Sequence, residues 1–328
     1  MRVSFLKRLF VLAQAYRFLM PFAIWLSKLY IEAWYGKVLR LEAQDPQRSD
    51  ELRRLMKLRR TLQPPTEQYQ VDIYIENMPV RANLCQEYCG NIYYGVGFEQ
   101  SELALAREFI ADNNTIFDVG ANIGVYTLLA SQLIGKGGRV HSFEPLPDVN
   151  TLLHFNVSRN HCKNVTVNQV AVGDQNGVVQ IFINAQNALS SLGNTHRGNV
   201  VDIKTVKMLT LDSYAESVGI SRVDFLKIDV EGFEGHVLRG AAKLLDASPD
   251  LIVMSELAKK NFAPLGFSID ETLNWMRARG FEIWMVGDHS LELHPTFSIK
   301  NEYPFQNFLF IRPSNPKYHL VKKYSVSS

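Results

Sequence analysis

The chain has 328 residues, of which 46% are hydrophobic and 21% charged, so it is long enough for one large domain with extensions or for two domains. Residues 1–60 contain 13 Lys and Arg against 5 Asp and Glu, whereas the rest of the chain contains 22 against 28. This distribution argues against a nucleic-acid groove in the acidic main body, and it confines the basic character to the N-terminal segment.

The cysteine content indicates a reducing compartment. Cys85, Cys89 and Cys162 are an odd, sparse set, which is not a disulfide framework. Cys85 and Cys89 form a C-x3-C pair without a matching His or Cys pair, so we expect buried thiols and not a metal site. We therefore predict a cytoplasmic protein.

Residues 1–62 predict a basic, apolar and helical N-terminal extension. The longest uncharged run, residues 18–27, is about half of what a membrane-spanning helix requires. Gln14 and Arg17 also make the apolar segment a poor signal peptide. On a helical projection, one polar stripe holds Lys7, Gln14, Arg17, Lys28 and Glu32. We expect residues 1–35 either to contact the cytoplasmic face of a membrane or to pack on the protein's own body or on a partner subunit of an oligomer. A membrane span is the least favoured alternative.

Residues 63–110 predict a β-rich lead-in followed by a helix. QVDIYI (70–75) and NIYYGVGF (91–98) have the composition of short strands. Residues 101–110 predict a helix with Ser101 as its N-cap.

Residues 111–313 alternate between strands and helices, and residues 314–328 form a C-terminal tail. The expected strands lie at 115–119, 139–143, 165–172, 223–228, 250–256, 281–286 and 305–311. The helices between them are expected at 125–134, 147–160, 235–245 and 269–280, with a β-rich insertion at 178–209. This order predicts an α/β fold with a doubly wound, mostly parallel, seven-stranded sheet whose final strand is antiparallel.

The turn after the first of these strands favours a cationic cofactor. In TIFDVGANIG (115–124), Gly120 and Gly124 allow a close approach of a cofactor, but the dinucleotide pattern GxGxxG is absent because Asp118 and Asn122 interrupt it. A carboxylate at this turn would repel a pyrophosphate. It suits S-adenosylmethionine, which carries an ammonium and a sulfonium. Glu144, at the end of the next strand, is placed to accept hydrogen bonds from ribose hydroxyls.

A second charged group follows the strand at 223–228. Lys227, Asp229 and Glu231 are spaced i, i+2, i+4, so on an extended strand they would face one way. Glu256 ends the following strand. These carboxylates are candidate proton acceptors, with Lys227 holding Asp229 ionised. A divalent metal held by Asp229 and Glu231 is the alternative, although no residue is assigned as a metal ligand.

Two weaker candidates complete the predicted site. His236 is a possible base, but it follows in a predicted helix and is disfavoured. The polar segment 184–199 is either a cover over the acceptor, touching it through Ser190, Ser191 or His196, or an ordinary surface loop.

Taken in order, five motifs resemble the FkbM-type methyltransferases over roughly residues 95–312: DVGANIG, FEP (143–145), AVGD (171–174), LD (211–212) and KIDVEG (227–232). The resemblance implies a class I methyltransferase fold, S-adenosylmethionine as donor, and a hydroxyl acceptor on a sugar, glycan or small natural product. It places Lys227, Asp229 and Glu231 next to the acceptor. It assigns the cofactor site to Asp118, Gly120, Asn122, Gly124, Glu144 and Asp174.

Two other classes of function stay open at this point. One is a nicotinamide-dependent oxidoreductase on a Rossmann-like fold, against which the missing GxGxxG argues. The other is a non-catalytic, membrane-associated binding module. A nucleic-acid acceptor is not expected, because the chain has no N-P-P-aromatic motif.

Overall fold

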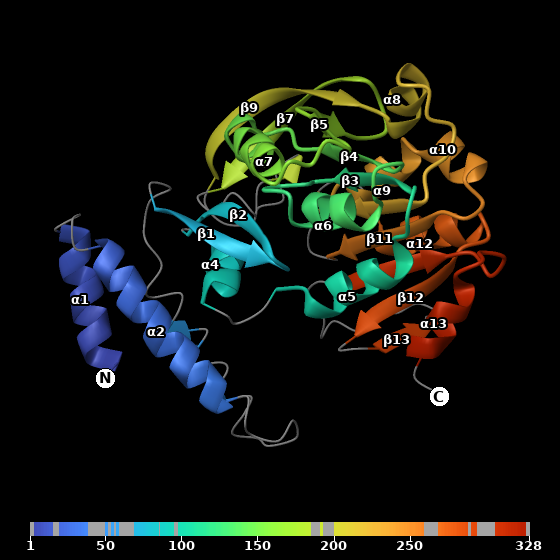
Figure 1. Ribbon diagram of the computed structural model, residues 1–328. Coiled ribbons are helices and arrows are strands. Elements are labelled where there is room, and N and C mark those ends of the chain that lie inside the picture. Colours follow the sequence, from blue (N-terminus) through green and yellow to red (C-terminus); the bar gives the residue numbers. More distant parts are fainter. Residues whose placement is uncertain are drawn as a thin grey trace. The chain divides into compact units, whose positions relative to one another are not determined.

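The computed structural model divides the chain into two compact units, Met1–Phe98 and Glu99–Ser328. Figure 1 shows their elements in chain order. The structure describes residues 3–15, 20–38, 50–51, 54–55, 57–58, 69–84, 86–94, 98–184, 191–192, 200–258, 268–287, 290–293 and 306–325.

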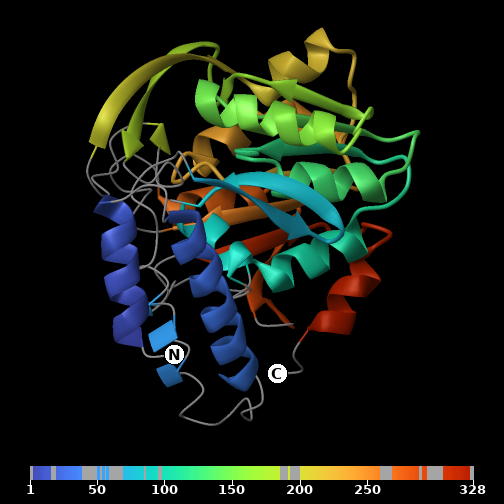
Figure 2. The same cartoon turned by 60° about the vertical axis from the view of Figure 1, so that its left-hand side comes forward.

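The first unit begins with two helices, α1 (Val3–Ala15) and α2 (Met20–Val38), which lie side by side in both views (Figure 1, Figure 2). Their inner faces join one apolar cluster with Leu55, Leu58, Leu84 and Tyr94. The side chains that they bury there are Leu6, Phe10, Ala13, Met20, Ala23, Ile24 and Ile31. One face of each helix is therefore buried within the first unit of the protein itself.

The predicted polar stripe does not run along one helix, because α1 ends at Ala15 and α2 begins at Met20. Lys28 and Glu32 lie one turn apart on α2 and form an ion pair of 3.8 Å, whereas Arg17 lies outside the described residues. No helix in the described part of the chain is long and apolar enough to cross a membrane.

The predicted strand at 91–98 was wrong. Residues Glu87–Tyr93 form helix α4, and Tyr94 follows it with only 1% of its surface exposed. The aromatic residues that suggested a strand are used for packing, which overrides β propensity. Cys89 in this helix is buried, as expected, and Cys85 lies outside the described residues.

The partner of the predicted strand β1 (Gln70–Ile75) is β2 (Met78–Asn83), which the sequence analysis missed. β2 contains Pro79, which is tolerated because this antiparallel sheet has two strands and therefore only edges. Arg81 donates to Asp72 across the pair, with 2.7 Å between Nε and Oδ1.

The second unit contains the predicted α/β sheet. Its order is β13-β12-β14-β11-β10-β3-β4-β5, and β3, β4, β5, β10 and β11 are mutually parallel. The strands are β3 (Thr115–Val119), β4 (Arg139–Phe143), β5 (Val165–Asn168), β10 (Phe225–Ile228), β11 (Ile252–Leu257), β12 (Glu282–Gly287), β13 (Ser290–Leu293) and β14 (Gln306–Ile311). The final strand β14 is antiparallel and inserted beside β11, as predicted, and the short β13 adds an eighth strand at the edge.

Helices cover both faces of this sheet. One face carries a large apolar core and is covered by α8 (Leu211–Ser217), α9 (Glu234–Arg239), α10 (Ala242–Ala247) and α12 (Ile269–Arg277). The other face, with Asp118, Lys227 and Asn307, is covered by α5 (Gln100–Phe109) and α6 (Val125–Leu133). The remaining helices are α7 (Pro147–Arg159) and α13 (Tyr318–Tyr324). Polar groups are thus gathered on one side of the sheet, where the site lies.

The β-rich insertion forms a separate four-stranded sheet of order β6-β9-β7-β8. Its strands are β6 (Ala171–Val172), β7 (Gly177–Asn184), β8 (Ser191–Leu192) and β9 (Val200–Leu209). The predicted strand 165–172 is therefore divided between two sheets. Of the candidate acceptor contacts in segment 184–199, Ser191 belongs to β8, while Ser190 and His196 lie outside the described residues.

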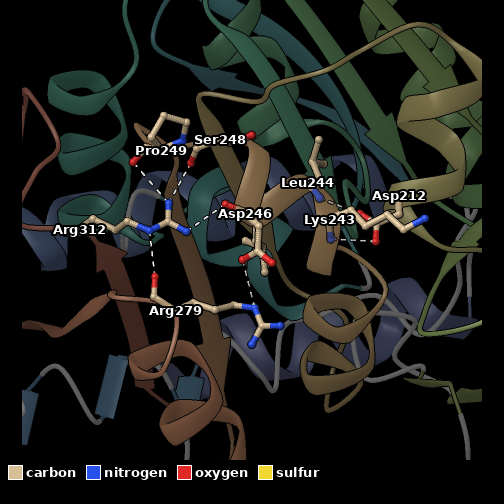
Figure 3. Close-up of polar contacts among 9 residues, drawn as sticks. Asp212, Lys243, Leu244, Asp246, Ser248, Pro249, Arg279 and Arg312 are labelled. Carbon is tan, nitrogen blue, oxygen red and sulfur yellow. Dashed lines mark hydrogen bonds and ion pairs between the residues drawn. The ribbon is translucent and has the colours of Figure 1, made fainter.

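Two side chains fasten the loops on either side of α10 (Figure 3). Asp212, from the LD motif, accepts hydrogen bonds from the backbone N–H groups of Lys243 and Leu244 at 3.0 and 2.9 Å. Arg312, which follows β14, donates to the carbonyl oxygens of Leu245, Ser248, Pro249 and Arg279. The LD motif thus has a structural role in the first turn of α10.

Asp212→Ala is expected to lower the free energy of unfolding by about 0.5–2 kcal/mol, the usual cost of removing an oxygen that caps a helix. Asp246→Ala is a suitable control, because Asp246 forms only a partly exposed ion pair of 3.4 Å with Arg279, which is worth about 0–1 kcal/mol. Urea denaturation of both variants measures the difference. Equal stability of the two variants would contradict the capping role.

Candidate active site

The loop between β3 and α6 is pressed against the end of β10. Gly120 has φ +82°, and a Cβ at this position would lie 1.8 Å from the backbone oxygen of Asp229. The Asp229 N–H in turn donates to the carbonyl oxygen of Val119 at 2.9 Å. The sequence analysis attributed Gly120 to the close approach of a cofactor. The structure shows that the approach it permits is that of the chain's own backbone, which brings DVGANIG and KIDVEG together.

Glu144 holds the same loop from the end of β4. Its Oε2 accepts from the Asn122 N–H at 3.1 Å, and its Oε1 accepts from the Leu146 N–H at 2.9 Å. Asn122 adopts a left-handed conformation (φ 50°), which asparagine tolerates better than most residues. Gly124, with φ +100°, begins α6. Glu144 is 6% exposed, and burial raises its pKa to about 7.

Asp118 lies under this loop on β3. Its Oδ2 accepts from the Thr127 hydroxyl on α6 at 2.5 Å, and the same hydroxyl contacts Ser142 Oγ at 2.6 Å. Burial raises the pKa of Asp118 to about 6, although the hydrogen bond from Thr127 and the charge of Lys227 oppose the increase. Two buried carboxylates, Asp118 and Glu144, fit a cationic cofactor and would repel a pyrophosphate.

Lys227 and Asp229 are brought together as predicted, with 3.7 Å between Nζ and Oδ2. Lys227 is buried, and its Nζ lies 5.0 Å from the centre of the Tyr126 ring. Burial lowers the pKa of Lys227, but the carboxylates around it, Asp229 first, raise it further, so that it lies well above its ordinary value. This lysine is therefore a permanent positive charge beneath the site.

Glu231 does not continue the alternation of the strand. β10 ends at Ile228, and Glu231 lies in the following turn with φ 57°. Glu231 still acts on Glu256. Burial and, after it, the negative charges of Asp229 and Glu231 raise the pKa of Glu256 to about 9. The expectation that Lys227, Asp229 and Glu231 face one way along an extended strand was therefore wrong for its last member.

Two carboxylates of the site were missed. Glu99, immediately before α5, lies beside Asp229 and Glu256: single carboxylate oxygens of the three residues lie within 4.8 Å of one another. Because Glu99 precedes α5, the expected cap at Ser101 was wrong. No sequence pattern marks Glu99, since only tertiary structure brings it to Asp229, 130 residues later.

Glu234 is the second of these. Its Oε1 accepts from the N–H groups of Val230 and Gly232 at 3.1 and 3.0 Å, so it shapes the turn that carries Glu231. Burial raises its pKa to about 8. An acidic residue in the first turn of a predicted helix was the available signal.

Asp174 belongs to a separate pair. Its Oδ2 lies 2.9 Å from Nδ1 of His236, whose ring stacks on Phe233 with 3.9 Å between centres. The predicted place of Asp174 near the adenine stays a prediction. His236 is hydrogen-bonded to Asp174. That it is disfavoured as the catalytic base stays a prediction.

The buried carboxylate of Glu144 gives a pH-dependent prediction. Because its pKa rises from the model-compound value of 4.5 to about 7 on folding, the folded state binds more protons between these values, and stability falls as the pH rises through them. Relative to wild type, Glu144→Gln should therefore gain stability between pH 4.5 and 8, on the order of 3 kcal/mol. Denaturant titrations at both pH values measure this difference. A difference in stability between wild type and Glu144→Gln that does not change with pH would contradict this prediction.

Comparison with known proteins identifies related sequences. The chain matches the Methyltransferase FkbM domain over residues 118–283. It is 26% identical over 155 residues to the hexuronic acid methyltransferase AglP of Haloferax volcanii, covering 47% of this chain and 61% of AglP. It is 32% identical over 156 residues to the 31-O-demethyl-FK506 methyltransferase FkbM of Streptomyces tacrolimicus, covering 39% of this chain and 59% of that protein. The chain therefore spans about three fifths of the length of each relative.

Among solved structures, an O-methyltransferase from Bacillus cereus in complex with SAH aligns with a TM-score of 0.40 and 13% identity. The alignment covers 66% of this chain and 83% of that one.

Proposed function

The chain belongs to the FkbM methyltransferase domain family, and from this premise we propose that it transfers a methyl group from S-adenosylmethionine to a hydroxyl group on a sugar, glycan or small natural product. One observation carries the proposal: the acidic loop at Gly120 lies directly against the backbone of Asp229. The loop that we propose binds the cationic donor therefore lies next to Asp229, the proposed proton acceptor.

The donor site comprises Asp118, Gly120, Asn122, Gly124 and Glu144. Glu144 still has acceptor capacity for ribose hydroxyls, since a carboxylate offers about four lone-pair sites and two of them are used by Asn122 and Leu146. Asp118 favours the positive charge of the methionine portion. When bound, S-adenosylmethionine supplies an electrophilic methyl group on a sulfonium.

Asp229 is the residue to which we assign the acceptor proton. Its side chain is 30% exposed, so a substrate can reach it, and its Oδ2 lies 3.7 Å from the Lys227 ammonium. With the donor bound, Asp229 would accept the proton of the acceptor hydroxyl as its oxygen takes the methyl group. Glu231 and Glu256 lie near enough to share its charge environment.

A nicotinamide-dependent oxidoreductase is the weaker candidate. Two buried acidic residues at the first turn oppose a pyrophosphate, and the family match points to methyl transfer. No observation favours a non-catalytic binding module over an enzyme.

The test is transfer of radiolabelled methyl from S-adenosylmethionine to a panel of hydroxylated acceptors, with glycans first. We expect label in an ether product that resists mild alkali. Label that mild alkali releases would indicate a methyl ester and would contradict hydroxyl methylation.

We also assign the exposed face of the two N-terminal helices to an anionic membrane surface. Large apolar side chains remain exposed there: Phe5, Val11 and Leu12 on α1, and Phe22, Trp25 and Leu29 on α2. Lys7, Arg8 and Lys37 are also exposed on these helices. Basic groups beside an apolar face are typical of helices that lie on anionic lipid.

Replacing Phe22, Trp25 and Leu29 by Ser in the full chain should abolish sedimentation with vesicles that contain phosphatidylserine, because about 25 cal/mol per Å² of buried apolar surface is lost. The affinity for S-adenosylmethionine should not change. If the wild-type protein ignores such vesicles at low salt, the membrane assignment is wrong.

A further inference from the structure

Glu99, Asp229 and Glu256 form a partly exposed cluster of acidic side chains. Its members come from three separate segments: the residue before α5, the end of β10 and strand β11. All three side chains are partly exposed, and their carboxylate oxygens lie within 4.8 Å of one another. A ligand that enters here meets the carboxylate oxygens of Glu99 and Asp229 as hydrogen-bond acceptors, whereas Glu256, whose pKa is raised to about 9, can also donate.

Beneath these carboxylates lies a donor without a hydrogen-bond partner. The Lys227 side chain is 2% exposed, and its Nζ makes no hydrogen bond with the described residues, since its nearest charged neighbour is Asp229 Oδ2 at 3.7 Å. A buried ammonium has three N–H groups, and leaving them without acceptors is costly. The Lys227 ammonium therefore indicates a ligand atom that accepts hydrogen bonds.

The combination of donor and acceptors selects the chemistry of that ligand. Three carboxylates alone would suit a divalent cation, but a cation cannot accept a hydrogen bond from the Lys227 ammonium. A hydroxyl group both donates and accepts, so it satisfies carboxylates and ammonium together.

We propose that Glu99, Glu256 and Lys227 bind a second hydroxyl of the acceptor, adjacent to the one facing Asp229, so that the methyl acceptor is a vicinal diol. This inference rests on the proposed function.

Within this subsite, Glu99 accepts from the second hydroxyl, and Lys227 donates to the oxygens. Tyr126 is a positioning residue: its hydroxyl donates to Glu99 Oε2 at 2.6 Å and fixes the carboxylate. Glu99 has φ 42°, a left-handed conformation that is unfavourable for glutamate and that is typical of residues held in place at a functional site.

Saturation-transfer NMR titrations of the full-length protein with cis- and trans-1,2-cyclopentanediol and with cyclopentanol test the inference, with S-adenosylhomocysteine present and absent. Wild type should bind one of the diols at least about tenfold more tightly than the mono-alcohol, since hydrogen bonds to charged groups are strong. Glu99→Gln should reduce this preference to about threefold or less, and Tyr126→Phe, which keeps the packing, should reduce it partly. Glu108→Gln is the matched control, because Glu108 lies on α5 and forms an exposed ion pair of 3.5 Å with Lys323. The Glu108→Gln protein should prefer the diol as strongly as wild type does.

Equal binding of diols and cyclopentanol by wild type would overturn the diol subsite. Submillimolar binding of Mn²⁺ that disappears in Glu99→Gln would overturn it in favour of a metal site. The two proposals can fail separately. A protein that binds S-adenosylhomocysteine without preferring a diol loses only this inference, and one that prefers a diol without binding S-adenosylhomocysteine loses only the methyltransferase assignment.

Discussion

Asp229→Asn is expected to reduce turnover by about 10²–10⁴-fold, the usual effect of losing a general base. The substitution keeps the size of the side chain and one acceptor oxygen, but it removes the charge that accepts the proton. The affinity for S-adenosylmethionine should persist, because Gly120 contacts the backbone oxygen of residue 229 and not its side chain. Turnover with a working acceptor, measured beside cofactor affinity by calorimetry, gives both quantities.

The matched control is Asp224→Asn at the opposite end of the same strand. Asp224 accepts from the Thr115 N–H at 2.7 Å, far from the carboxyl ends of the strands, so its loss should leave turnover unchanged. If Asp229→Asn retains turnover within about threefold, far less than a general base contributes, Asp229 is structural and Glu256 or Glu231 becomes the candidate. If cofactor binding disappears together with turnover, the residue belongs to the donor site. Loss of wild-type activity to a chelator would favour the alternative of a metal held at this residue.

Glu144→Ala is expected to weaken binding of S-adenosylmethionine by about 10- to 150-fold, since a hydrogen bond to a charged group is worth roughly 1.5–3 kcal/mol. The structure adds a second reason. Glu144 also holds the N–H groups of Asn122 and Leu146, so its removal loosens the loop that receives the donor. Calorimetric titration of wild type and variant measures the loss.

Asp148→Ala controls for the removal of an acidic side chain nearby. Asp148 lies in the first turn of α7 and forms only an exposed ion pair with Lys204 at 3.2 Å. The Asp148→Ala protein should bind S-adenosylmethionine as tightly as wild type does. Unchanged affinity in Glu144→Ala would remove Glu144 from the ribose site.

The alternation of apolar strands and helices was sufficient to predict the sheet of the second unit, including its antiparallel last strand, because each buried strand leaves a local pattern. The first unit was harder. Tyr93 and Tyr94 suggested a strand, yet their region is helical up to Tyr93, and β2 was hidden by Pro79 and its polar residues. In both places tertiary packing decided the outcome and local propensity did not.

The residues of the candidate site also divide into those that the sequence could predict and those that only tertiary structure determines. Asp118 and Lys227 lie near the carboxyl ends of their strands, and Glu144 and Asp229 follow theirs, so their meeting could be predicted from the order of parallel strands. Glu99 could not be predicted, because it lies before a helix and reaches the site only through the path of the chain. Glu231 was predicted to continue the strand. The left-handed turn after Ile228 instead ends the alternation that the sequence suggests.

The central claim is that the acidic loop at Asp118 and Glu144 binds S-adenosylmethionine and excludes a dinucleotide. Calorimetric titration of the full-length protein with S-adenosylmethionine, and in parallel with NAD, tests it without knowledge of the acceptor. The account predicts saturable one-to-one binding of S-adenosylmethionine and no heat of binding with NAD. Binding of NAD, with none of S-adenosylmethionine, would contradict it.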